Sequence, residues 1–345
     1  MQNRIGIIGT GAIAGVHAGV VSQMQNAVLQ GVYSRSGSRG AEFARKHSCT
    51  AYADLADMLK NVDIVSVCTP SGAHLEAALP AIEAGCHLIV EKPLEISVER
   101  CDRILEAAEQ RGVLVAGVFQ SRFYDAARQV KTAVDQRRFG RLSMGDAYVK
   151  WYRSQEYYSG SEWKGTEQYD GGGALMNQSI HAVDLLQWFM GEVKNVQAKT
   201  AALGHEGLEV EDTAVAILEF ANGALGVIEG STAVYPGFLK RIEISGSAGS
   251  AVLEEETLKE WSFAEESVED EEIRKRYGSS AGSGGGAADP GAISHTGHQR
   301  QFEDLIAAVR DTRPPFVDGR EARKSVAIIQ AIYESSRTGE ITPVR

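Results

Sequence analysis

The sequence lacks the marks of a metal-stabilised, disulfide-bonded or membrane-spanning protein. Its 345 residues include four cysteines, and none of them forms the CxxC pairs of zinc modules. Cys68 and Cys86 lie in or beside apolar runs and are interpreted as buried thiols. The chain shows no basic-then-apolar leader and no apolar run of the ~18 residues that a membrane span needs. We therefore expect a reduced, cytoplasmic protein with no metal site and no membrane partner.

The sequence also has fewer basic residues than acidic ones. The chain has 35 Lys and Arg residues against 46 Asp and Glu residues, which gives a net charge of −11. Such a surface repels phosphate backbones, so we expect no nucleic-acid partner, and an anionic ligand needs a local binding device. The composition, 43% hydrophobic and 23% charged, is that of an ordinary globular protein, and the length favours two domains.

Residues 1–120 alternate short apolar runs with amphipathic stretches. The apolar, β-branched runs are 4–8, 29–34, 62–69, 87–91 and 113–119, and the helical patterns between them are 12–25, 39–47, 74–84 and 98–110. Nearly continuous apolar runs are typical of strands that are buried on both faces. The alternation predicts right-handed βαβ crossovers, and so an α/β Rossmann domain with a doubly wound parallel sheet.

After residue 120 the pattern predicts an α+β domain, residues 121–318, with an open, mostly antiparallel sheet. The expected helices are 124–138 and 174–190, and the expected strands are 142–151, 193–203, 212–220, 224–234, 240–245 and 251–255. Asn222-Gly223 joins two of these strands and is a strong hairpin signal. The Gly-rich segment 278–291 is interpreted as a mobile connector or as an active-site flap. The last part, 319–345, is expected to form a helix that packs back on the Rossmann domain.

A glycine-rich loop follows the first predicted strand and opens the first helix. It reads Gly9, Thr10, Gly11, Ala12, Ile13, Ala14, the pattern G-x-G-x-x-A. Gly9 permits a tight turn, Gly11 lets the backbone approach a pyrophosphate, and Ala14 keeps the helix close to the sheet. In this context the loop predicts a dinucleotide site, although a mere packing turn has the same pattern.

The end of the second predicted strand bears on the choice of cofactor. NAD sites usually place an acidic residue there, to accept hydrogen bonds from the ribose 2′-hydroxyl. This chain instead has Ser34, Arg35 and Arg39, and a guanidinium group can pair with a 2′-phosphate. We expect NAD(P), with NADP favoured over NAD. The alternative is that both arginines are solvated charges at a helix start.

Lys92 lies in the turn Glu91-Lys92-Pro93, directly after the fourth main strand. In an open α/β sheet the carboxyl ends of the strands form the ligand crevice. An ammonium group there can hydrogen-bond a substrate oxygen and stabilise its alkoxide character as hydride leaves. Thr69-Pro70, after the third main strand, is expected to form a wall near the cofactor. The alternative for Lys92 is an ordinary surface lysine.

A second cluster follows the glycine run 171–173. Asn177 and His181 are four residues apart and are expected on one helical face, with Asp184 three residues further on. An imidazole in this setting can take the proton of a hydroxyl group as a general base. The alternatives are a satisfied core histidine for His181 and a structural cap or ion pair for Asp184.

An aromatic segment precedes this cluster and supplies Arg153, Tyr157, Tyr158 and Trp163. Aromatic rings stack on sugar or base faces, and Arg suits a carboxylate or a phosphate. These residues are therefore candidates for substrate binding, and a subunit-interface patch is the alternative.

Together these motifs resemble the glucose–fructose oxidoreductase/inositol dehydrogenase/rhizopine-catabolism (Gfo/Idh/MocA) family. The resemblance also includes His74 and the segment Pro314–Gly319, and it runs over nearly the whole chain. It implies a Rossmann domain and an open-faced sheet domain that mediates homodimers or homotetramers. It also implies that His74 and Glu91 lie at the cofactor site, and that Lys92 and His181 serve the proton transfer that accompanies hydride transfer.

The chain departs from the family at Asn177, where many members carry Asp. A neutral amide cannot raise the basicity of a histidine as a carboxylate does, but it still hydrogen-bonds substrate. Here the chain is similar to the UDP-N-acetylglucosaminuronate 3-dehydrogenase subgroup, as it is at Lys150–Arg153, Trp163–Thr166 and Tyr235–Phe238. That subgroup resembles NAD users, which conflicts with the NADP expectation.

The function expected from these features is hydride transfer between nicotinamide and a CH–OH or C=O carbon of a sugar, sugar nucleotide or cyclitol. One alternative is an NAD-dependent glycosidase that oxidises its sugar transiently. Another is a catalytically silent ligand sensor of the same fold.

Overall fold

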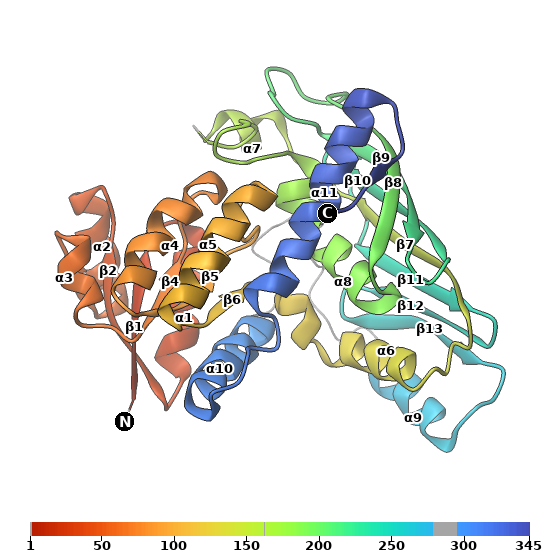
Figure 1. Ribbon diagram of the computed structural model, residues 1–345, viewed down its shortest axis with the longest axis horizontal. Helices are drawn as coiled ribbons and strands as arrows, with labels where there is room; N and C mark the ends of the chain where they lie inside the picture. Colours follow the sequence, from red (N-terminus) through yellow and green to blue (C-terminus); the bar gives the residue numbers. More distant parts are fainter. Residues whose placement is uncertain (1, 162, 279–294) are drawn as a thin grey trace. The chain divides into compact units, whose positions relative to one another are not determined.

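The computed structural model describes residues 2–161, 163–278 and 295–345 (Figure 1). Residue contacts divide the chain into two compact units. Unit 1 comprises Met1–Gln120 and His295–Val326, and unit 2 comprises Ser121–Ser294 and Ala327–Arg345. The Gly-rich segment 278–291 lies outside the described residues, apart from Gly278.

Unit 1 contains a six-stranded sheet in which all neighbouring strands are parallel. Its order is β3-β2-β1-β4-β5-β6. The strands are β1 (Asn3–Ile8), β2 (Ala27–Tyr33), β3 (Thr50–Tyr52), β4 (Ile64–Val67), β5 (His87–Val90) and β6 (Val115–Gly117). This is the order of a doubly wound dinucleotide-binding sheet, whose strand order reverses between β1 and β4. The predicted Rossmann architecture is confirmed.

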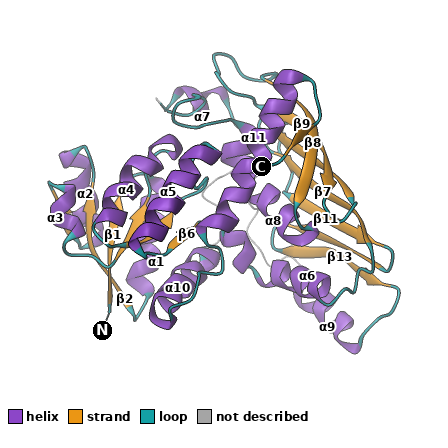
Figure 2. Cartoon of the chain, viewed as in Figure 1, coloured by secondary structure: helices purple, strands orange, loops and turns teal. Residues whose placement is uncertain are grey.

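Helices surround this sheet (Figure 2). They are α1 (Ala12–Gln23), α2 (Gly37–His47), α3 (Leu55–Leu59), α4 (His74–Glu83), α5 (Val98–Arg111) and α10 (Thr296–Asp311), with a 3₁₀ turn at η1 (Ser71–Ala73). The buried core joins Ile5 of β1 and Ile64 of β4 to Val20 of α1 and Phe302 of α10. Four elements far apart in sequence thus share one apolar core.

Unit 2 contains an eight-stranded sheet of order β13-β12-β11-β7-β10-β9-β8-β14. Its strands are β7 (Leu142–Lys150), β8 (Val193–Ala201), β9 (Thr213–Phe220), β10 (Leu225–Ser231), β11 (Arg241–Gly246), β12 (Gly249–Glu254), β13 (Thr257–Phe263) and β14 (Thr342–Pro343). Only β7 and β10 pair in parallel, and the other neighbours are antiparallel. The predicted hairpin at Asn222-Gly223 joins β9 to β10, and Gly223 has a φ of +85°.

The helical elements of unit 2 are η2 (Gln120–Phe123), α6 (Asp125–Asp135), α7 (Gln155–Ser159), η3 (Ala174–Ser179), α8 (Ile180–Met190) and α9 (Val268–Tyr277). In Figure 1, α6 and α8 lie along one face of the sheet, where α8 contacts β7 and β11. The expected helix 174–190 begins as a π-helix, η3, before it continues as α8. The strand β13 and the helix α9 were not expected from the sequence.

The C-terminal part of the chain is divided differently from the sequence expectation, which places 121–318 in the second domain. Helix α10 and the first part of α11 (Gly319–Thr338) belong to unit 1. Phe302, Leu305 and Ile306 of α10 fill the core of the parallel sheet, which explains this assignment. From Ala327 onward α11 belongs to unit 2, where Ser335 accepts a hydrogen bond from the main-chain N–H of Ala198. Domain boundaries at 120 and 318 stay a prediction.

None of the described helices is both long enough and apolar enough to cross a membrane.

Candidate active site

The loop after β1 has the geometry that a pyrophosphate requires. Gly9 has a φ of +111°, and a Cβ there would collide with the main-chain oxygen of Cys68. A Cβ at Gly11, by contrast, would meet nothing within 4 Å. Helix α1 begins directly afterwards, and no side chain caps its first N–H groups. Ala14 is fully buried against the sheet. Open space before uncapped N–H groups fits a dinucleotide phosphate.

The end of β2 carries the residues expected near the adenosine ribose. Strand β2 ends at Tyr33, and Ser34 after it is half-buried. Arg35 and Arg39 are exposed, and the segment between them contains no acidic residue. Their guanidinium groups are therefore accessible to a phosphate from solvent.

His74 joins two turns at the carboxyl edge of the sheet. Its Nδ1 lies 2.9 Å from the main-chain oxygen of Pro93, and its Nε2 lies 3.1 Å from that of Thr69. The side chain is 1% exposed, and burial lowers the pKa of His74. A neutral imidazole has one N–H, so it donates to one carbonyl at a time. His74 is thus an internal tie between the turns at Thr69-Pro70 and Lys92-Pro93.

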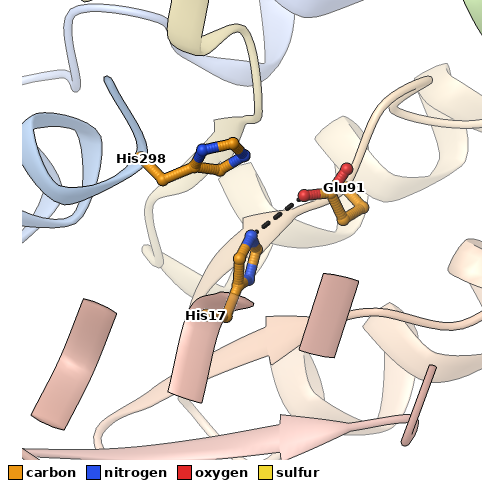
Figure 3. A group of neighbouring side chains, drawn as sticks. All are labelled: His17, Glu91 and His298. Carbon is orange, nitrogen blue, oxygen red and sulfur yellow. Dashed lines mark ion pairs between the residues drawn. The ribbon is translucent and has the colours of Figure 1, made fainter. Parts of the chain in front are cut away.

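Glu91 is also an internal residue, at 6% exposure. Its Oε1 lies 2.9 Å from Nε2 of His17 (Figure 3). Its Oε2 accepts a hydrogen bond of 3.1 Å from the main-chain N–H of Lys92. Lys92 is half-buried, and its peptide bond to Pro93 is cis. The structure therefore places Lys92 at the same sheet edge as the Gly9 loop, because β1, β4 and β5 are parallel neighbours.

In unit 2, the glycine run is held by a buried carboxylate. Glu211 accepts hydrogen bonds from the main-chain N–H groups of Gly173, at 2.9 Å, and Leu175, at 2.8 Å. The hydroxyl of Tyr333 donates to it at 3.1 Å. Burial raises the pKa of Glu211 to about 7. A Cβ at Gly172 would collide with the Tyr333 hydroxyl, and one at Gly173 with the main-chain oxygen of Glu211, so both positions require glycine.

The helix after the glycine run offers one partly exposed face. Among residues 174–187 only Asn177, Gln178 and His181 are half-buried, and the others are buried. The Nδ2 of Asn177 donates to Oδ1 of Asp170 at 2.5 Å, and its Oδ1 accepts from Nε2 of Gln178 at 3.1 Å. Asn177 and His181 thus share the exposed face, as their spacing predicts. Asp184 does not, because it is fully buried.

Arg153 is connected to this face through Gln178. Its side chain is 4% exposed, and its guanidinium donates to Oε1 of Gln178 at 2.9 Å. It lies 5.5 Å from the ring centroid of Tyr157 and 5.1 Å from that of Trp151. The Nε2 of Gln178 donates to the hydroxyl of Tyr157 at 2.9 Å. The structure therefore brings Arg153 and Tyr157 together with Asn177.

The other two aromatic candidates lie differently. Tyr158 is buried, and its hydroxyl lies 2.7 Å from Oγ1 of Thr232, so it is part of the core of unit 2. Trp163 is half-buried and lies beside Lys164, whose Nζ is 3.5 Å from the ring centroid of Tyr157.

Sequence reasoning missed three residues of this cluster. They are Asp170, Gln178 and Glu211. Gln178 is adjacent to Asn177, and Asp170 directly precedes the glycine run, so proximity to the motif could have indicated both. Glu211 is 38 residues from Gly173, and no local pattern indicates that pairing.

Comparisons with known proteins agree with this geometry. The family model described as an oxidoreductase family with an NAD-binding Rossmann fold matches residues 3–119. The model described as the GFO/IDH/MocA C-terminal domain matches residues 127–252. Myo-inositol 2-dehydrogenase of Thermotoga maritima is 31% identical over 258 residues, which cover 71% of this chain and 73% of that protein.

The chain belongs to the Gfo/Idh/MocA family of oxidoreductases.

One solved structure of a family member is similar over the whole chain. It is the WlbA dehydrogenase from Bordetella pertussis in complex with NADH and UDP-GlcNAcA. The identity is 33% and the TM-score 0.91, with 100% of this chain and 98% of that chain covered. This chain is therefore an NAD-binding oxidoreductase of the dehydrogenase class, as its sequence predicts. These relatives do not favour the glycosidase or the ligand-sensor alternative.

Proposed function

We propose that this oxidoreductase transfers hydride at a CH–OH carbon of a sugar nucleotide that carries a carboxylate. The observation that carries the proposal is the linked set of Arg153, Tyr157, Gln178 and Asn177, of which Asn177 and Gln178 lie on the partly exposed face of the π/α helix. The set offers a cation for a carboxylate, a ring for stacking and amides for hydroxyl groups. The UDP-GlcNAcA bound to the similar WlbA dehydrogenase supports this class of substrate.

His181 and Lys92 divide the proton chemistry between them. The imidazole of His181 takes the proton of the substrate hydroxyl as a general base. The ammonium group of Lys92 hydrogen-bonds the same oxygen and stabilises its negative charge until the C=O bond has formed. Bound NAD⁺ supplies the acceptor for the hydride that leaves the same carbon. The products are a ketone, NADH and one proton, and reduction follows the reverse path.

The loop of Gly9, Thr10, Gly11, Ala12 and Ile13 would hold the cofactor, because the uncapped N–H groups at the start of α1 suit a pyrophosphate. Thr69 and Pro70 form the adjoining wall, and His74 and Glu91 hold their turns in place from inside. We infer further that Arg35 and Arg39 allow NADP to bind as well as NAD, because a 2′-phosphate would meet two accessible guanidinium groups and no carboxylate.

Around the substrate, Asn177 hydrogen-bonds hydroxyl groups, while Asp170 fixes the direction of its amide. Arg153 and Tyr157 bind the acidic sugar, with Trp163 beside them. Tyr158 contributes only by packing, because its ring and hydroxyl are buried.

The uncovered face of the sheet in unit 2 is proposed as a homodimer or homotetramer interface. Met144 of β7 pairs with Leu225 of β10, and they are 44% and 51% exposed. Val215 and Ile217 of β9 add to the same apolar face at 48% and 55%. The register places Asp146, Glu219 and Glu229 among these side chains, and exposed apolar groups bordered by polar residues mark interaction sites.

The test is a substrate panel with the purified protein and NAD⁺, read at the absorbance of reduced nicotinamide. The panel contains UDP-N-acetylglucosaminuronate, UDP-glucuronate, UDP-N-acetylglucosamine, myo-inositol and glucose. We expect turnover with the two uronates and at least ~10-fold lower kcat/KM without the carboxylate. A preference for a neutral sugar or cyclitol would contradict the proposed substrate class.

A further inference from the structure

Three buried side chains of unit 1 converge at Glu91, the residue before Lys92 (Figure 3). His17 comes from α1, Glu91 from the end of β5, and His298 from α10. Their exposures are 0%, 6% and 6%. One ligand-type atom of each lies within 4.8 Å of those of the other two. Nδ1 of His298 has no hydrogen-bond partner among the described residues, and Nε2 of His17 and Oε1 of Glu91 meet as an ion pair and not in hydrogen-bond geometry.

The charges of the cluster are those of an ion pair beside a neutral histidine. Burial lowers the pKa of His17, but Cys68 and the Glu91 carboxylate outweigh it and raise that pKa to about 10. Burial raises the pKa of Glu91, but His17 outweighs it and lowers that pKa to about 2. Burial and the charge of His17 lower the pKa of His298 to about 4. At neutral pH, an imidazolium therefore faces a carboxylate away from water.

The neighbours of His17 fit its charged form. Its Nδ1 lies 2.7 Å from Oγ of Ser66, which itself lies 3.3 Å from Sγ of Cys68. The Nε2 faces the Glu91 carboxylate, which can only accept, whereas the Ser66 hydroxyl can accept from Nδ1 or donate to it, so these contacts accommodate an imidazolium. From α10, the ring of Phe302 packs edge-on against His17 at 5.1 Å, and His295 lies beside His298.

A metal ion is the competing reading of these residues, because two histidines and a glutamate are a zinc-type ligand set. Tetrahedral bonds of ~2.0–2.1 Å place two ligand atoms about 3.3 Å apart. The 2.9 Å between Nε2 of His17 and Oε1 of Glu91 is shorter than this separation. The contact is closer than two ligands of a tetrahedral zinc ion lie, and it suits a charge pair.

We propose that His17, acting through Glu91, is a positioning residue for Lys92. The Glu91 carboxylate contacts the imidazolium with one oxygen and the main-chain N–H of Lys92 with the other. A neutral residue 17 removes the main counter-charge of this buried carboxylate, which leaves His298 and the ammonium group of Lys92 as the other groups whose charges act on it. When His17 is charged, Glu91 accepts the hydrogen bond from the main-chain N–H of Lys92 and does not draw the Lys92 ammonium group away from the substrate. The inference rests on the proposed function only in taking Lys92 as a catalytic residue.

The first test follows Lys92 itself and needs no substrate. Lysines are ¹³C-methylated, and the Lys92 signal is assigned by its loss in Lys92→Ala. In His17→Gln we expect the pKa of Lys92 to rise by about one unit, because an uncompensated carboxylate now lies beside it. In His17→Gln/Glu91→Gln it should return to within ~0.3 unit of the wild-type value. An unchanged Lys92 signal in His17→Gln, or no return in the double variant, overturns the proposal.

The second test measures turnover and NADH affinity for the same variants. We expect His17→Gln to lower kcat at least ~10-fold with NADH affinity within about twofold, and Glu91→Gln added to it to restore most of the loss. His87→Gln, at the opposite end of β5, is the control and should leave kcat unchanged. If Lys92→Ala retains turnover, the proposed function fails, whereas failure of the double variant alone overturns only this inference.

A third measurement uses the wild-type protein, so it tests the proposal even if His17→Gln does not fold. In the wild-type protein, ¹⁵N-histidine spectra assigned residue by residue should show His17 with both nitrogens protonated up to pH 8 or above, with His205, which lies beside Asp212, assigned separately. No such imidazolium overturns the proposal. One equivalent of tightly bound zinc in the purified protein, lost in His298→Ala, overturns it in favour of a metal site.

Discussion

Arg122 and Asp184 form a two-pronged ion pair in the core of unit 2. The Nε of Arg122 donates to Oδ2 of Asp184 at 2.8 Å, and its Nη2 donates to Oδ1 at 2.7 Å. The side chains are 1% and 0% exposed. The pair joins η2 to α8, the helix that carries His181. Asp184 is therefore a structural partner of Arg122. This ion pair is the alternative role that the sequence indicates for Asp184.

Replacing one member of this pair should destabilise the protein without a specific effect on the chemistry. Asp184→Ala leaves the Arg122 cation buried and uncompensated, which costs about 3–5 kcal/mol. Urea unfolding should show this loss, while kcat of the remaining folded protein stays within ~10-fold of the wild-type value. Glu334→Ala, which breaks an exposed pair with Arg337, is the matched control and should cost under ~1 kcal/mol. Equal losses in the two variants would contradict the structural role of the buried pair.

Glu211 should make unit 2 less stable as pH rises. Its folded pKa of about 7 lies above the ~4.3 of an unfolded Glu, so the folded state binds the proton more tightly. The stabilisation is complete below pH ~4 and is lost as pH rises through 7, by roughly 3 kcal/mol. Glu211→Gln should remove this pH dependence from the free energy of unfolding between pH 5 and 8, whereas the exposed Glu206→Gln should not. Parallel pH profiles for wild type and Glu211→Gln would contradict the raised pKa.

Lys92 and His181 should be needed for turnover but not for nucleotide binding. We expect Lys92→Ala and His181→Ala each to lower kcat by ~10²–10⁴, the usual contribution of a general acid or base. The dissociation constant of NADH, measured by its fluorescence, should stay within about threefold. A large loss of NADH affinity in both variants would assign these residues to cofactor binding. Lys131→Ala, at a lysine that pairs with Asp135 on α6, is a control for the loss of a lysine.

The sequence predicts unit 1 more completely than unit 2, for a physical reason. Buried parallel strands have continuous apolar runs, and the glycine loop must follow the first of them, so one motif locates both the fold and the cofactor site. The short strand β3 is partly exposed and carries no such signal. Helix α10 has an amphipathic pattern, but the pattern does not say which sheet the apolar face covers.

The candidate site in unit 2 could be predicted only where local spacing decides it. Asn177 and His181 share a face because they are four residues apart. Asp170 and Glu211 are connected to the helix by tertiary contacts, and Arg153 reaches Asn177 only through Gln178. The spacing of apolar residues is interpreted with the period of an α-helix, so it does not indicate the π-helical start, η3.

Arg35 should decide how well the protein uses NADP. Arg35→Ala removes an exposed cation that can pair with the 2′-phosphate, and we expect KM for NADP to rise about 10-fold while KM for NAD changes less than twofold. Arg39→Ala should have a smaller effect in the same direction. Arg45→Ala, further along α2, is the control and should leave the ratio of the two KM values unchanged. Equal changes with both cofactors in Arg35→Ala would mean that this residue does not contact the 2′ position.

The apolar face of the sheet in unit 2 should hold subunits together. In Ile217→Glu a charge replaces a side chain that is 55% exposed and pairs along the sheet with Val227. Burying that charge in a subunit interface is costly, so light scattering should show a smaller assembly than for the wild type. The monomer should keep its fold, because position 217 points away from the core residues Ala216 and Leu218. Val268→Glu, at a 92% exposed side chain of α9, is the charge control and should leave the mass unchanged. A wild-type protein that is already monomeric would exclude this face as an interface.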